Sequence, residues 1–231
     1  DSYVSDDSAE AKTHNENDQE EKQQKDGFWY LFSFTKLGKA RYLSHINIMT
    51  IFERAFQKAD IELEYTSGYN PKPRMEFAHP LTLGISSKAE IARCKLKSEI
   101  DEEYILNRMK GVMPEGIYIN KVGQVPNQKG RGRGQSLMAL YAGSIYTISD
   151  SHGNSDSVSI DSLEASIMDF INAKKGSTNW IQRANTINSE NGNALRLFVP
   201  AQGRSKFSVK ELCAYTNNSI GDFLSQFHIE R

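Results

Sequence analysis

Apolar and polar residues alternate along the chain in patterns that predict two successive series of strands and helices. The first series begins at residues 28–32, an aromatic run typical of a buried strand. Downstream, apolar residues recur at spacings of three and four, at Ile46, Met49, Phe52, Phe56 and Ala59. This spacing predicts an amphipathic helix, and Ser44 just before it is a good N-cap.

Extended segments and a second helix complete the first series. Residues 62–65, 89–97 and 117–125 are predicted to be strands, and 75–77 to be a short extended segment between the first two of them. Asp101 is predicted to cap the second helix, which Pro114 and Gly116 close. Its apolar residues are Ile105, Met109 and Met113. The resulting order β-α-β-β-α-β is the split βαβ arrangement of a ferredoxin-like domain.

A weaker version of the same pattern recurs in the second half of the chain. Asp161 is predicted to cap a helix with Leu163, Ile167, Phe170 and Ile171 on one face. Residues 145–148, 180–187 and 194–199 are predicted to be extended, and a capping box at 208–211 predicts a last helix. The predicted fold class is therefore α+β, with two tandem ferredoxin-like (split βαβ) domains.

Composition divides the chain into four parts. Residues 1–26 hold nine Asp or Glu and three Lys, and this polar stretch is predicted to be a disordered acidic tail or linker. Residues 27–126 are predicted to form the first domain, 127–136 a Gly/Arg linker, and 137–231 a second, divergent α+β domain. Residues 27–134 carry 17 basic and 11 acidic side chains, which indicates either a basic face for a polyanion or an unevenly charged solvated surface.

The sequence lacks the motifs that mark several classes of protein and binding site. Across 231 residues no run approaches the ~18 apolar residues of a membrane span, and no secretory signal is visible. Cys94 and Cys213 form neither a disulfide framework nor a Cys-x-x-Cys site. Radical-SAM cysteine, P-loop and dinucleotide-binding motifs are absent, and the five histidines lack metal-ligand spacing. We therefore predict a cytoplasmic protein with no membrane contact, no metal and no cofactor.

The segment 66–74 combines turn formers with an aromatic ring and two cations. Tyr69 offers a stacking surface, and Lys72 and Arg74 offer positive charge, which is the combination that single-stranded or looped RNA requires. The alternative is a rigid surface loop in which two prolines fix the backbone and Tyr69 packs on the core.

A second group of candidate residues lies between the first strand and the first helix. Lys36, Lys39 and Arg41 flank a predicted turn, where each can contact a phosphate or serve only as surface charge. His45 lies at the predicted helix N-terminus, which favours a neutral imidazole able to donate a proton or act as a base. The alternative for His45 is a capping residue that bonds Asn70 or the backbone.

The motifs of residues 34–90 are Phe34-Thr35-Lys36-Leu37-Gly38-Lys39-Ala40-Arg41-Tyr42-Leu43-Ser44-His45, Phe52-Glu53-Arg54-Ala55, Gly68-Tyr69-Asn70-Pro71-Lys72-Pro73 and Pro80-Leu81-Thr82-Leu83-Gly84. In these motifs the chain resembles the radical-SAM-linked bacterial family called domain of unknown function 2344. The resemblance implies an RNA-metabolism accessory module with a radical-SAM protein as its partner, in cis or in trans. Asn47, Thr50 and Arg93 depart from the family pattern, so no role that needs a carboxylate at 47 or 93 is carried over.

These observations lead to one functional prediction and two alternatives. The chain is predicted to be an accessory RNA-binding or substrate-presenting domain that works with a radical-SAM enzyme on tRNA or rRNA. The candidate RNA-binding residues, which we expect to converge on one concave surface, are Lys36, Lys39, Arg41, Tyr42, His45, Tyr69, Asn70, Lys72 and Arg74. The first alternative is a metal-independent endoribonuclease using His45, by analogy with RAMP-type nucleases. The second is a protein-interaction adaptor.

Overall fold

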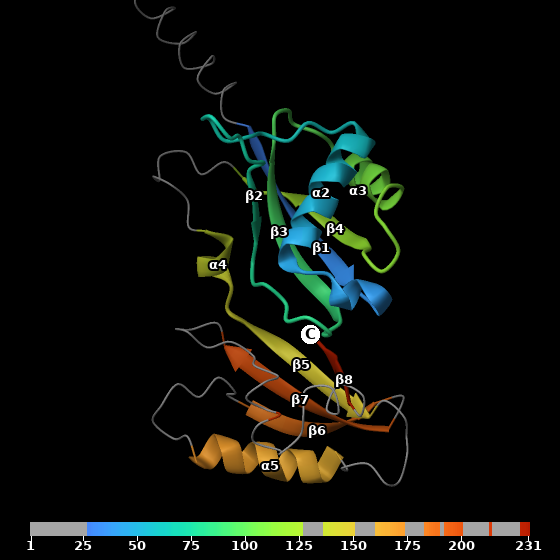
Figure 1. Ribbon diagram of the computed structural model, residues 1–231, viewed down its shortest axis with the longest axis vertical. Helices are drawn as coiled ribbons and strands as arrows, with labels where there is room; N and C mark the ends of the chain where they lie inside the picture. Colours follow the sequence, from blue (N-terminus) through green and yellow to red (C-terminus); the bar gives the residue numbers. More distant parts are fainter. Residues whose placement is uncertain are drawn as a thin grey trace, which may run out of the picture.

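The computed structural model describes residues 27–126, 136–150, 160–173, 183–189, 192–200, 213 and 227–231. These residues form two four-stranded antiparallel sheets, one above the other in Figure 1, each accompanied by helices. The predicted α+β fold with two ferredoxin-like halves is confirmed. The predicted acidic tail at 1–26, most of the predicted linker and the capping box at 208–211 lie outside the described residues.

The first sheet has the strand order β2-β3-β1-β4, which is the order of a split βαβ unit. Its elements are β1 (Phe28–Lys36), the short 3-10 helix η1 (Gly38–Tyr42), α2 (His45–Ala59), β2 (Met75–Phe77), β3 (Ser87–Leu96), α3 (Glu102–Lys110) and β4 (Ile119–Gln124). The two long helices α2 and α3 lie together on one face of this sheet (Figure 1).

The core of the first half is built from aromatic rings of β1 and α2. Phe32 and Phe34 point inward from alternate positions of β1, while Leu31, just before Phe32, faces outward. Phe52 of α2 packs edge-to-face against both rings, with centroid distances of 6.3 Å and 4.9 Å. This packing holds α2 against the sheet and thereby fixes where the two ends of the helix lie.

The apolar face of α2 is rotated from the predicted one. Ile46 was predicted to belong to it, yet its side chain is 73% exposed, and Ile48 is buried instead. The helix geometry gives the reason, because six residues at about 100° each turn Ile46 about 120° away from Phe52. Ser44 caps α2 as predicted, and its hydroxyl accepts a hydrogen bond from the backbone N–H of Asn47.

Three further predictions about local structure are corrected. Residues 62–65 do not form a strand and contribute two isolated bridges, because β2 occupies the edge of β3 beside them. The helix α3 ends at Lys110 with Gly111 as its C-cap, so Met113 lies beyond the helix. In the second half, α5 already begins at Ile160, so Asp161 lies inside the first turn and is not the N-cap.

The second sheet repeats the topology of the first, with the order β6-β7-β5-β8. Its elements are the short helix α4 (Leu137–Leu140), β5 (Gly143–Asp150), α5 (Ile160–Ala173), β6 (Arg183–Ser189), β7 (Gly192–Pro200) and β8 (Phe227–Glu230). The predicted helix at 161–171 and the predicted strands at 145–148 and 194–199 lie within α5, β5 and β7. Neither α4 nor η1 was predicted from the sequence.

The two halves are joined where the end of the chain lies beside the start of β3. Ser86 and Glu230 form a parallel bridge, and the backbone N–H of Arg231 donates to the Ser86 carbonyl at 2.8 Å. Lys88 and Glu230 form an exposed ion pair at 2.8 Å. Arg231 and Glu90 form a second, buried ion pair. The end of β8 therefore connects the second sheet to the first.

Candidate nucleic-acid interface

The loop that follows the bridge residues 63–65 presents Tyr69 to solvent. Two hydrogen bonds between Thr66 and Lys72 close this loop. The Thr66 N–H donates to the Lys72 carbonyl at 2.8 Å, and the Lys72 N–H donates to the Thr66 hydroxyl at 3.0 Å. Gly68 allows the tight turn with a φ of 132°. Tyr69 at the tip is fully exposed and does not pack on the core, so the alternative of a core-packed ring is wrong.

The two cations of this loop differ in how they are engaged. The Arg74 guanidinium lies 3.0 Å from the Glu64 carboxylate and is partly exposed. Lys72 is exposed, and no acidic side chain among the described residues lies within ion-pair distance of its ammonium. Lys72 is therefore the cation best placed to meet a phosphate beside Tyr69. Asn70 is exposed between them.

A second aromatic and cationic group lies on η1, before α2. The Arg41 guanidinium lies over the Tyr42 ring, 4.8 Å from its centroid, and donates to the Tyr42 hydroxyl at 2.7 Å. Tyr42 is 58% exposed, and Lys39 is exposed one turn earlier. Gly116 holds the start of η1 in place, because its carbonyl accepts a hydrogen bond from the Leu37 N–H at 2.8 Å. The contact is close enough that a side chain at position 116 would collide with the Leu37 carbonyl.

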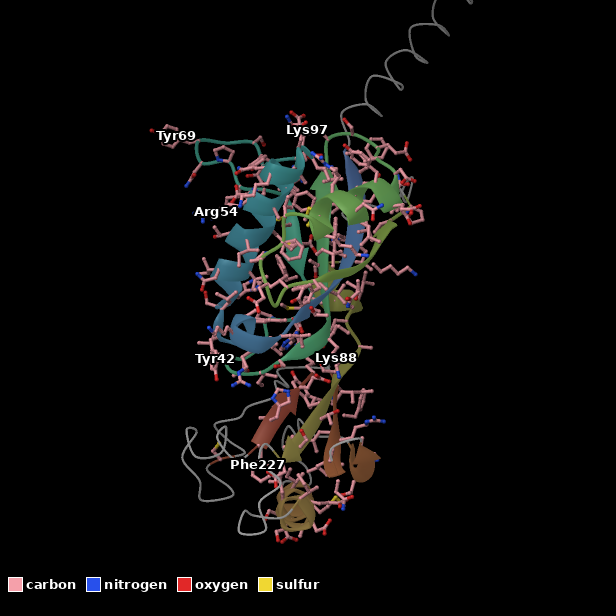
Figure 2. The ribbon with its side chains drawn as sticks, turned by 90° about the vertical axis from the view of Figure 1, so that its right-hand side faces the viewer. Tyr42, Arg54, Tyr69, Lys88, Lys97 and Phe227 are labelled. Carbon is pink, nitrogen blue, oxygen red and sulfur yellow. The ribbon has the colours of Figure 1, made fainter. Side chains whose placement is uncertain are left out.

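The two groups do not converge on one concave surface as predicted. They lie at opposite ends of α2, whose 15 residues span about 22 Å. Figure 2 shows Tyr42, Arg54 and Tyr69 along one side of the molecule, with exposed Arg54 between the two tyrosines. We call this strip, from η1 along the exposed face of α2 to the loop 68–74, the α2 surface.

Lys36 does not belong to the α2 surface. Its side chain is buried, and its ammonium donates to the Leu43 carbonyl at 2.7 Å. Burial lowers the pKa of Lys36, the nearby Glu90 carboxylate opposes this change, and the Arg231 cation adds to it. The alternative of Lys36 as plain surface charge is therefore wrong, because β1 carries this residue inward.

His45 is the first residue of α2 and is half-buried. Its ring lies edge-to-face against Phe77, with a centroid distance of 5.2 Å. Burial and the neighbouring Lys36 lower its pKa, so the imidazole is neutral at neutral pH. Neither ring nitrogen has a hydrogen-bond partner among the described residues, so the predicted alternative of a bond to Asn70 or the backbone is wrong.

A small cleft that the sequence did not predict opens beside His45. It is lined by Lys36, His45 and Glu90, and its apolar walls include Phe34, Phe77 and Leu81. Its enclosed volume is about 20 Å³, which is room for one or two water-sized groups. Glu90 is held in place by Arg231, whose guanidinium donates to both carboxylate oxygens. No sequence pattern indicated this contact, since its partners are 141 residues apart.

The described residues contain no group of three or more His, Cys, Asp or Glu placed to hold a metal ion. Both cysteines are buried, and burial raises the pKa of the Cys94 thiol well above its usual range. Within the same residues, no helix has the length and apolar character needed to cross a membrane.

The family comparison covers most of both halves. The family model described as "Uncharacterized protein conserved in bacteria (DUF2344)" matches residues 30–212. The chain belongs to the DUF2344 family. No curated protein matches this DUF2344 chain. Among solved structures, it is similar to an unknown protein from Galdieria sulphuraria at 12% sequence identity and a TM-score of 0.27, over 87% of this chain and 95% of the other.

Two of the four motifs of this DUF2344 chain come together in space around the cleft. Lys36 and His45 belong to the first motif, and Pro80 and Leu81 belong to the Pro-Leu-x-x-Gly motif. All four line the cleft, although β2 and the whole of α2 separate them in sequence. The third motif, at 68–73, lies at the other end of α2. The matched residues 30–212 include all these positions.

Proposed function

We propose that this DUF2344 protein is an accessory RNA-binding domain whose α2 surface holds single-stranded or looped RNA. One observation carries the proposal. Two exposed tyrosines, Tyr42 and Tyr69, each lie beside cations at opposite ends of α2, on one side of the molecule (Figure 2). An exposed tyrosine ring beside cations offers unpaired RNA both a stacking surface for a base and positive charge for a phosphate.

The chemistry of the α2 surface matches that of unpaired RNA. Each tyrosine offers a ring face on which a base can stack, a contact worth about 1–3 kcal/mol per base. Lys39, Arg54 and Lys72 supply charge for the phosphates, which sets position without reading sequence. Because about 22 Å separates the ends of α2, the surface fits a segment of several nucleotides.

The proposed partner is a radical-SAM enzyme, acting in cis or in trans on tRNA or rRNA. The family resemblance implies this partner, and the chain carries no radical-SAM cysteine motif of its own. In this proposal the DUF2344 protein presents the RNA, and the enzyme supplies the chemistry.

Two alternatives are less well supported by the geometry. A general acid or base is normally oriented by a hydrogen bond from a third group, and His45 has none among the described residues. An endoribonuclease using His45 therefore lacks the support that such a residue needs. A protein adaptor would need acidic groups on its partner to meet the cations beside Tyr69, and it would bind no RNA in the experiment below.

The proposal is tested by the salt dependence of RNA binding. We expect the wild-type protein to bind a labelled 12-nucleotide single-stranded RNA, with an association constant that falls steeply as salt is raised. Replacing Lys72 by alanine should weaken binding and reduce the slope of log K against log salt by about 0.7, the contribution of one phosphate contact. The measurement is fluorescence anisotropy over a series of salt concentrations.

The matched control is Lys110→Ala, which removes an exposed lysine from the last turn of α3. This variant should keep the wild-type affinity and slope. Equal losses in both variants would indicate unspecific attraction by net charge, and would contradict an interface on the α2 surface.

A further inference from the structure

Lys36 is a buried cation with few partners. Its ammonium has three N–H donors, and among the described residues only one is used, toward the Leu43 carbonyl. Burying an ammonium costs free energy unless counter-charges and hydrogen bonds offset that cost. Lys36 is one of the residues that line the cleft.

Glu90, the acidic residue of the cleft, attracts the Lys36 ammonium but forms no direct ion pair or hydrogen bond with it. The Arg231 guanidinium donates to both of its carboxylate oxygens, and the Glu90 and Arg231 side chains are both almost completely buried. The charges of that pair cancel, which leaves the cleft with the positive charge of Lys36. The cleft is therefore set up for an anionic group.

His45 adds a neutral hydrogen-bonding group to the same cleft. Its ring is held in place by Phe77, and its two nitrogens lack partners among the described residues. A neutral imidazole carries one N–H, which can donate a hydrogen bond to an oxygen atom of an anion. A phosphate monoester is mostly a dianion at neutral pH, because its second pKa is about 6, so its oxygen atoms accept such a bond.

The size of the cleft limits what enters it. The enclosed volume of about 20 Å³ accepts one or two oxygen atoms of a phosphate group, whose remaining atoms then lie at the mouth of the cleft, and it excludes a base with its sugar. The cleft lies beside the N-terminus of α2, at the η1 end of the α2 surface, so an RNA on that surface ends near it. The positive end of the helix dipole adds a smaller attraction for negative charge.

We propose that the cleft binds the terminal phosphate of an RNA, with the Lys36 ammonium as its counter-charge and His45 as a hydrogen-bond partner. This proposal deepens the proposed function and rests on it, because the rest of the RNA lies on the α2 surface. It assigns the protein a preference for phosphorylated RNA ends.

The test measures how well three eight-nucleotide RNAs of one sequence compete with a labelled RNA for the protein. One RNA has a 5′-phosphate, one has a 3′-phosphate, and one has hydroxyls at both ends. One phosphorylated RNA should bind about tenfold more tightly than the hydroxyl-ended RNA, the effect of a charge-assisted hydrogen bond. Lys36→Met should abolish this preference and leave the affinity for hydroxyl-ended RNA unchanged. Lys39→Met is the matched control and should keep the preference.

A second variant and a second readout keep the test decisive. If Lys36→Met does not fold, His45→Gln should reduce the preference, because it removes the imidazole at the mouth of the cleft. Equal binding of all three RNAs by the wild-type protein would overturn the terminal-phosphate site and leave the proposed RNA function standing.

If no RNA binds, the proposed function fails, and the cleft is then tested alone. 5′-AMP should raise the Tm of the wild-type protein but not that of Lys36→Met, as expected for a ligand that binds the folded state. An unchanged wild-type Tm with 5′-AMP would overturn the cleft as a phosphate site.

Discussion

Replacing Glu90 by alanine is expected to lower the free energy of unfolding by about 3 kcal/mol or more. Glu90 and Arg231 form a buried ion pair, with side-chain exposures of 9% and 6%. Removing the carboxylate leaves the Arg231 guanidinium and the nearby Lys36 ammonium buried without it. The pair also joins β3 to the end of β8, so its loss should loosen the two halves from each other. Chemical denaturation followed by circular dichroism measures the change.

An exposed ion pair between the same two segments provides the control. Lys88 is 71% exposed and pairs with Glu230, so Lys88→Ala should change stability by less than about 1 kcal/mol. A double variant, Glu90→Leu with Arg231→Met, should recover most of the lost stability, because apolar residues can replace a buried ion pair. A loss for Glu90→Ala no larger than that for Lys88→Ala would show that the buried pair does not hold the halves together.

Replacing Phe52 by alanine is expected to lower the free energy of unfolding by about 4 kcal/mol, which is within the usual range for a buried aromatic residue. The Phe52 ring is completely buried and lies edge-to-face against Phe34 and Phe77, with centroid distances of 4.9 Å and 5.4 Å. Phe77 also contacts the His45 ring, so removing the Phe52 ring should also disturb the position of His45 in the cleft. Urea denaturation of the variant gives the free energy of unfolding.

Ile46→Ala on the same helix is the matched control for Phe52→Ala. Because Ile46 is exposed, this change should stay within about 0.5 kcal/mol of the wild-type stability. Similar costs at the two positions would mean that the apolar face of α2 runs through Ile46, as the sequence predicted. That result would contradict the packing of α2 described above.

The fold was predicted well where local patterns decide the structure. The aromatic run of β1 and the cap at Ser44 are local signals, and the structure confirms both. The prediction failed at residues 62–65, because strand formation depends on which neighbour occupies the edge of β3. It failed also at Ile46, since spacing alone did not decide which of two adjacent apolar faces packs on the sheet.

The candidate site was predicted only in part. Tyr69, Asn70 and Lys72 were identified as loop residues from turn chemistry, and the structure shows that all three are exposed. Lys36 was misplaced, because whether a strand residue points inward depends on the sheet and not on its charge. The ion pair of Glu90 with Arg231 was not predicted, because it depends on how the two halves meet.

The most direct test of the RNA interface is photo-crosslinking of the wild-type protein to single-stranded RNA, followed by mapping of the modified peptides. We expect crosslinks at Tyr69 and Tyr42, at the two ends of the α2 surface. Tyr104 and Tyr118, both 51% exposed and located elsewhere, serve as internal controls and should remain unmodified. Crosslinks at these two control tyrosines, with none at Tyr42 or Tyr69, would contradict an RNA interface on the α2 surface.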